Sequence, residues 1–167
     1  AAGSFSVASG LIGRPFSIIS TSLTNSFRPS LALPDSDIPS RCIPKWIAIS
    51  TGIGLCMALC VYLFRDQVLN ILLAKEHREQ AKSIIGIIAI AWTFTISTHA
   101  MENELMARGF NTIIMKCQVL GAITTTILAA VFGTAFGIVG AASARAISEL
   151  IRALVTWRQI SILSESK

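Results

Sequence analysis

The stretch WIAISTGIGLCMALCVYLF, residues Trp46–Phe64, contains 19 consecutive residues without a charge. A helix needs about 20 predominantly apolar residues to cross a hydrocarbon core that is about 30 Å thick. The length of this run meets that requirement within a residue or two. The stretch therefore predicts a membrane-spanning helix, and it makes lipid the solvent against which the rest of the chain is interpreted.

The composition of the whole chain also favours lipid. The 167 residues are 53% hydrophobic and 14% charged, with a mean hydropathy of +0.66. An ordinary soluble domain has about 45–50% apolar and about 25% charged residues. Nine acidic and fourteen basic side chains would leave much of a soluble surface without polar cover, so we expect an apolar exterior. The net charge of +5 then indicates basic loops beside anionic lipid, and no nucleic-acid partner.

Four further stretches are expected to be spans. Cys117–Phe136 is an uncharged run of 20 residues, and Ser83–Thr98 is an uncharged run of 16 that can extend through Ala100. The other two stretches carry charges. The expected fold is all-α and integral to the membrane, a bundle of about five transmembrane helices, with spans at about 1–27, 46–64, 83–100, 117–136 and 138–157.

Two other architectures fit less well. A buried core in a soluble protein would need amphipathic partner helices, and only residues 65–82 are polar enough to form one. Barrel strands would show about ten residues of alternating polarity, which these runs lack. Lys and Arg counts in the loops give seven on the side of residues 24–45, 99–116 and the C-terminal tail, against four on the other side. That difference favours a cytoplasmic location for the first side.

Charged residues inside two of the expected spans are the candidate functional residues. Arg14 precedes Pro15 about midway through the first apolar stretch, where a proline favours a kink. An arginine there costs about 2.5–3.5 kcal/mol unless it faces a polar cavity or snorkels to an interface. We therefore expect Arg14 to face a central cavity.

The second group of charges is Arg145, Glu149 and Arg152, spaced i, i+4 and i+7 on one face of the last helix. We expect Glu149 to pair with both arginines inside the bundle, and Arg152, near the end of the span, to be able to snorkel. A structural clamp and a substrate-binding role are both open for Arg145 and Glu149. Two neighbouring acids, Glu102 and Glu104, are interpreted as a solvated helix end.

The order of these segments resembles a known family. Residues 1–32, with Pro15 in the middle of an apolar helix and FRPSLA at its end, look like the helix that opens much of the C-terminal half of bacterial lipid-linked oligosaccharide flippases. The stretches VLNILLAKEHREQAKSIIGIIAIAW, ENELMARGFNTIIMKCQVLGAI and FGIVGAASARAISELIRAL are similar to later parts of that half. The superfamily also holds the multidrug and toxin extruders.

The resemblance implies a function and a partner. It implies that residues 1–167 are a partial C-terminal transmembrane bundle of a two-bundle transporter, whose missing N-terminal half completes a cationic cavity. The transporter would flip undecaprenyl-linked oligosaccharide across the bacterial cytoplasmic (inner) membrane for polysaccharide or lipopolysaccharide biosynthesis, without a cofactor. Two alternatives stay open: a cation-coupled multidrug-type antiporter of the same superfamily, and a membrane-embedded transferase. The sequence shows no nucleophile motif, phosphate-binding loop or metal-ligand spacing, so we expect no enzyme activity and no metal site.

Overall fold

The computed structural model describes residues 9–10, 13–22, 25, 42–72 and 75–165, and nearly all of them are helical. No strand occurs within these ranges. The elements are a helical segment at residues 13–22, α2 (Cys42–Leu63), α3 (Arg65–Leu72), α4 (Lys75–Ala107) and α5 (Asn111–Glu165). The expected all-helical class is confirmed.

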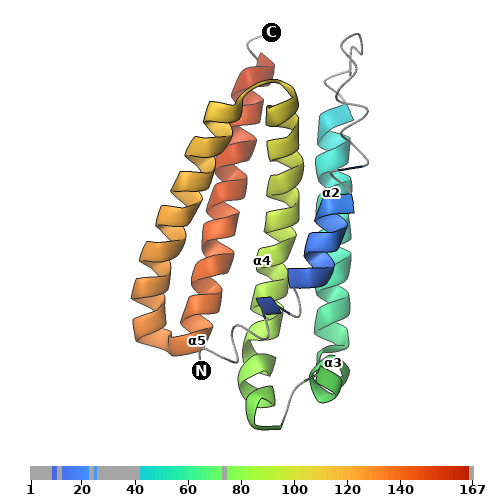
Figure 1. The fold of residues 1–167 in the computed structure, drawn as a ribbon, viewed down its shortest axis with the longest axis vertical. Helices are drawn as coiled ribbons and strands as arrows, with labels where there is room; N and C mark the ends of the chain where they lie inside the picture. Colours follow the sequence, from blue (N-terminus) through green and yellow to red (C-terminus); the bar gives the residue numbers. More distant parts are fainter. Residues whose placement is uncertain (1–8, 11–12, 23–24, 26–41, 73–74, 166–167) are drawn as a thin grey trace.

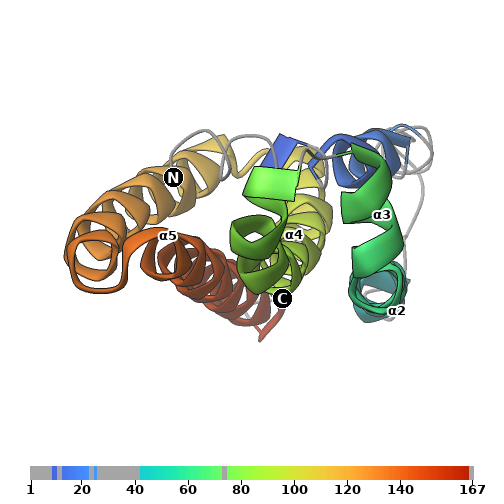
Figure 2. The same cartoon turned by 90° about the horizontal axis from the view of Figure 1, so that it is seen from below.

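The helices form an up-and-down bundle around α4 (Figure 1). α4 packs against α2 on one side and against α5 on the other, while the short α3 connects α2 to α4 at one end. Viewed from below, α4 lies between α2 and the two arms of α5 (Figure 2). Consecutive long segments run in opposite directions, as short connections between neighbouring helices require.

α5 is two helical arms joined at Gly137. This residue has φ 61° and ψ −135°, which lies outside helical geometry and inside a region that glycine adopts without steric cost. The ribbon reverses direction there, so residues 111–136 run down the bundle and residues 138–165 run back up (Figure 1). The expected division between spans 117–136 and 138–157 therefore falls at the residue where the helix breaks.

The turn between α4 and α5 has a specific cause in the sequence. Gly109 has φ 80°, and its N–H donates to the carbonyl of Met106 at 3.0 Å. The next N–H, that of Phe110, donates to the carbonyl of Leu105 at 2.9 Å. This pair of bonds is the Schellman arrangement, which satisfies the last carbonyls of a helix and favours glycine at the left-handed position.

Among the described residues, two helices are long and apolar enough to cross a membrane, Ala81–Ala107 and Asn111–Leu163, and Ile47–Leu63 is a shorter apolar helix. The expected spans 46–64 and 83–100 lie almost wholly in α2 and α4. The span expected at 1–27 is helical at residues 9–10, 13–22 and 25, and its other residues lie outside the described part of the chain.

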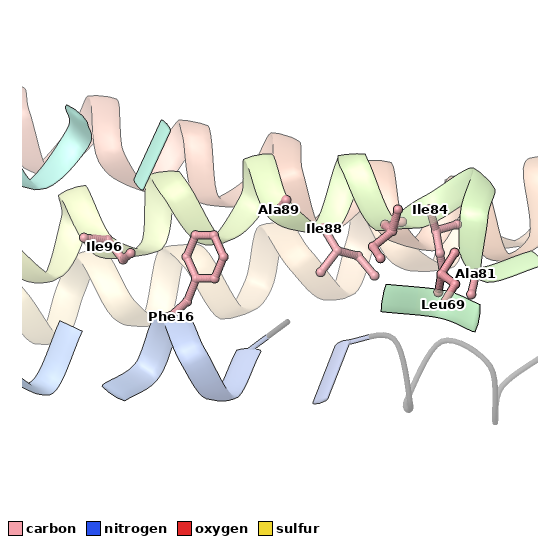
Figure 3. Packing of buried hydrophobic residues seen from close by; sticks show 9 residues of the cluster. Phe16, Leu69, Ala81, Ile84, Ile88, Ala89 and Ile96 are labelled. Carbon is pink, nitrogen blue, oxygen red and sulfur yellow. The ribbon is translucent and has the colours of Figure 1, made fainter. Parts of the chain in front are cut away.

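One apolar core joins the first helical segment, α3 and α4. Phe16, fully buried, points at α4, where Ile88, Ala89 and Ile96 are buried, and Leu69 of α3 covers the other end of the row (Figure 3). Burying a side chain of this size contributes about 1.5–3 kcal/mol in water. At the edge of α3 the Lys82 ammonium lies 2.9 Å from Asp66, and this hydrogen bond lowers the pKa of Asp66.

Hydroxyl groups and small residues make the helix contacts. Thr93 of α4 donates to the carbonyl of Gly54 in α2 at 3.1 Å, and the Thr51 and Ser97 hydroxyls are 2.9 Å apart. Between the arms of α5, the Ser148 hydroxyl donates to the carbonyl of Gly121 at 3.0 Å. Close approach at small residues with hydroxyl bonds across the interface is typical of packing between membrane helices.

Close packing beside the reversal of α5 depends on a single glycine. A Cβ built on Gly133 or Gly137 meets nothing within 4 Å. The close contact is at Gly140, where a Cβ would lie 1.9 Å from the carbonyl oxygen of Phe132. The reversal at Gly137 brings these two positions together.

Candidate functional site

Arg14 lies on the outer surface of the helical segment 13–22. Gly13 and Phe16 turn toward α4 and are buried, whereas Arg14 and Pro15 are exposed. Gly13 is needed at this contact, because a Cβ there would lie 2.6 Å from the Trp92 ring. The structure therefore leaves Arg14 exposed among the described residues, and its role in substrate binding stays a prediction.

Arg145 binds the N-terminal part of the chain, 136 residues away. Its Nη1 donates to the Ser9 hydroxyl at 2.9 Å, and its guanidinium carbon lies 5.0 Å from the centre of the Trp92 ring. A cation over an indole face is stabilised by about 0.5–2 kcal/mol, with the larger value where water is excluded. Phe16 packs against the same indole, with the ring centres 6.2 Å apart. Trp92 lies halfway along α4, so Arg145 is held at mid-depth of the bundle.

A buried ionic network lies further along α5. Arg152 Nη2 donates to Glu102 Oε1 at 2.6 Å, and Arg152 Nη1 lies 3.7 Å from Glu149 Oε2. The three side chains are 14%, 6% and 16% exposed, in the order Arg152, Glu102, Glu149. The other oxygen of Glu102 is 3.5 Å from His99 Nδ1 and accepts a hydrogen bond of 3.5 Å from Gln118 Nε2. The network thus ties α4 to both arms of α5.

Glycine makes room for this network. A Cβ on Gly121 would lie 3.0 Å from the Cδ of Arg152, so the first arm of α5 can approach the guanidinium stem only where a side chain is absent. The Arg152 Nε and Glu149 Oε2 atoms are buried without a hydrogen-bond partner among the described residues. Two carboxylates share one guanidinium here, so the network of Glu102, Glu149 and Arg152 carries one excess negative charge when both acids are ionised.

The predictions for the charged trio are partly confirmed. Glu149 does pair with Arg152. No ion pair joins Glu149 to Arg145 in the part of the chain that the structure describes, so the prediction that Glu149 bridges both arginines is wrong. The helix presents Arg145 to Ser9 and Trp92 instead. Arg152 does not reach an interface by snorkelling, because its guanidinium turns inward to Glu102.

Sequence reasoning missed Glu102. The sequence places Glu102 at a helix end that we expected to be solvated. In the structure it is 4% exposed and is the main partner of Arg152. Its neighbour Glu104 pairs with Arg108 on another face of α4. A signal was available: Arg152 and Glu102 are charges near the same end of their respective spans, and an unpaired charge at that depth needs a partner.

No group of three or more His, Cys, Asp or Glu residues that could hold a metal ion occurs among the described residues. Cys56 and Cys60 are free, exposed thiols on α2. Over the residues that the structure describes, fold and site define a helical bundle that has two helices long and apolar enough to cross a membrane and has Glu102 and Arg152 turned inward. Comparisons with protein-family models, with curated proteins and with solved structures found no match for the chain.

Proposed function

We propose that the chain is a multi-pass bundle of the bacterial cytoplasmic membrane and forms most of the second bundle of a transporter that flips undecaprenyl-linked oligosaccharide. The observation that carries the membrane part of the proposal is an apolar ridge along the first arm of α5. Its members are spaced four residues apart and are all more than half exposed: Met115, Val119, Ile123, Ile127 and Val131.

The length and setting of this ridge fit lipid. Sixteen residues of helix rise about 24 Å, which is most of a hydrocarbon core about 30 Å thick. Exposed Leu55 and Leu59 on α2, and Leu150 and Leu154 on the second arm of α5, extend the apolar surface to other sides of the bundle. A continuous apolar surface of this kind is unfavourable in water. Glu102, by contrast, is buried inside the bundle, while these apolar side chains lie on its outside.

Two arginines support a role in moving an anionic lipid. Arg14 is exposed beside Pro15, and Arg145 is held at mid-depth against Trp92. A guanidinium stays charged when water is removed and donates paired hydrogen bonds to phosphate oxygens. A diphosphate headgroup would cross next to such groups, while its polyprenyl tail stays in lipid along the apolar exterior.

One observation favours a second candidate, a cation-coupled antiporter of the same superfamily. Glu102 and Glu149 share Arg152, so one proton or monovalent cation could neutralise the excess charge of the network. In that case, transport would depend on a gradient of the coupling ion and would accept organic cations. The flippase would instead require a lipid diphosphate.

The test is flipping of a fluorescent undecaprenyl-diphosphate disaccharide in vesicles. We expect the complete two-bundle transporter to move the probe and residues 1–167 alone to leave it in place, since one bundle supplies one wall of the passage. In the complete transporter, Arg14→Gln should slow flipping about tenfold or more, because a charge-assisted bond is lost. The matched control is Arg158→Gln, which changes an exposed arginine near the end of α5. Flipping by residues 1–167 alone, or equal rates for the two variants, would contradict the proposal.

A further inference from the structure

A cavity of about 500 Å³ lies between the N-terminal helical segment and α4. The volume is within the range of roughly 300–1,000 Å³ that small-molecule sites occupy. Its walls come from both elements and are formed by Ser17, Ser20, Thr21, Asn25, Trp92, Thr95, His99 and Asn103.

The chemistry of the walls restricts the ligand. Four of the eight lining side chains are hydroxyls, two are amides, and the others are an imidazole and an indole. None of these eight side chains is a carboxylate, so the described part of the wall offers no oxygen anion of the kind that a bound metal cation prefers. None of the eight is a lysine or arginine, so the described part of the wall offers no fixed cation of the kind that a phosphate prefers. Hydroxyl and amide groups, which both donate and accept hydrogen bonds, match a ligand that is itself uncharged and rich in hydroxyls.

The indole adds an apolar wall that the protein holds in place. Trp92 is fixed by Phe16, whose ring centre is 6.2 Å away, and by the Arg145 guanidinium over its ring. A sugar ring has apolar C–H faces as well as hydroxyls, so it needs one such wall among polar groups. We propose that this cavity binds an uncharged sugar residue of a glycolipid headgroup, an inference that rests on the proposed transport of lipid-linked oligosaccharide.

Arg14 lies where the charged part of the same ligand would be. Arg14, Ser17 and Thr21 are spaced i, i+3 and i+7, so they share one face of the helical segment 13–22. Three residues of helix separate Arg14 from Ser17 by about 4.5 Å along the axis. A sugar held by Ser17 and Thr21 would therefore place the phosphate that joins it to the lipid beside Arg14.

His99 connects the cavity to the ionic network. Its side chain is 43% exposed and lines the cavity, while its Nδ1 faces Glu102 Oε2 at 3.5 Å. The orientation of the imidazole leaves Nε2 as its other polar atom for the ligand. A sugar hydrogen-bonded to His99 would thus contact a side chain that also contacts Glu102, the residue that joins α4 to Arg152 of α5.

Sugar binding can be measured with Trp92 as the reporter. The chain has three tryptophans, and Trp46→Phe with Trp157→Phe leaves Trp92 alone. In phosphatidylcholine nanodiscs, we expect saturable changes in Trp92 emission with at least one of three uncharged disaccharides: maltose, mannobiose or diacetylchitobiose. Inorganic phosphate should give no saturable change. A response to phosphate alone, or to none of the sugars, would overturn the proposal.

Variants assign the response to the cavity. Ser17→Ala and Thr21→Val each remove one hydroxyl from an exposed position and should weaken sugar binding about tenfold. The matched control is Thr126→Val, which removes an exposed hydroxyl on α5 that bonds only within its own helix. Equal weakening by the control, or unchanged binding by both cavity variants, would place the response elsewhere and overturn the proposal.

Two further experiments distinguish a glycolipid ligand from a free sugar, and distinguish a failure of sugar binding from a failure of the proposed transport. Dodecyl maltoside, added below its micelle concentration, should bind at lower concentration than maltose, because its tail is already in the bilayer; equal or weaker binding would contradict a glycolipid ligand. If residues 1–167 bind sugar but the complete transporter does not flip the lipid probe, the proposed transport is wrong and the sugar site is supported. If the complete transporter flips the probe but residues 1–167 do not bind sugar, the proposed transport is supported and the sugar site is wrong.

Discussion

The buried network of Glu102, Glu149 and Arg152 predicts an order of stabilities for three single substitutions. Arg152→Leu strands both carboxylates at side chains that are 6% and 16% exposed, and breaking a buried ion pair costs about 3–5 kcal/mol. Glu102→Leu removes the 2.6 Å bond but leaves Arg152 with Glu149, so we expect a loss of about 1.5–3 kcal/mol. Glu149→Leu removes only the 3.7 Å contact and should cost below about 1 kcal/mol.

The free energy of unfolding can be measured in mixed detergent micelles by following helicity as denaturing detergent is added. Arg158→Leu is the matched control, since it removes an exposed arginine that follows Arg152 by six residues in the same helix. The double variant Glu102→Leu with Arg152→Leu should be more stable than Arg152→Leu alone, because one of the two stranded carboxylates is gone. Equal losses for Glu149→Leu and Arg152→Leu, or losses no larger than that of Arg158→Leu, would refute the network as a stabilising element.

Two further predictions follow from exposure and close packing. In a cysteine-free background, Arg14→Cys should react with a membrane-impermeant thiol reagent, because position 14 is exposed. Ala142→Cys, at a fully buried position, is the control and should not react. Protection of Arg14→Cys from both sides of the membrane would show that the position does not face water. Gly140→Ala should lower the free energy of unfolding by about 1–3 kcal/mol, since its Cβ would lie 1.9 Å from the Phe132 carbonyl oxygen. Gly133→Ala is the control and should be neutral or stabilising, because the space around Gly133 is open. The opposite order of stabilities would contradict the packing at the α5 reversal.

The sequence predicted the helices well because their signal is local. An uncharged run such as Trp46–Phe64 has one physical solution in lipid, and a break at Gly137 needs only the one residue that accepts its backbone angles. The trio of charges was also placed correctly on one helix, and spacing alone predicted the contact between Glu149 and Arg152.

Partners from other helices could not be predicted in the same way. Arg145 is turned toward Ser9 and Trp92, which are separated from it by 136 and 53 residues, and spacing within one helix carries no information on such contacts. Glu102 shares a helix end with Glu104 and looks solvated in the sequence. Only the docking of the second arm of α5 brings Arg152 to it. The cavity lined by Ser17 and Trp92 arises in the same way, because its walls come from two separate helices.

The most direct test of the central claim, that lipid covers this bundle, is a spin-label scan along the first arm of α5. Single cysteines at residues 115–131, labelled in a cysteine-free chain in bilayers, report collisions with oxygen, which dissolves in lipid, and with a nickel chelate, which stays in water. We predict oxygen maxima at Met115, Val119, Ile123, Ile127 and Val131, with little nickel contact, and high nickel contact at exposed Asp66. Nickel contact along the ridge as high as at Asp66 would show that water covers it and would contradict the account.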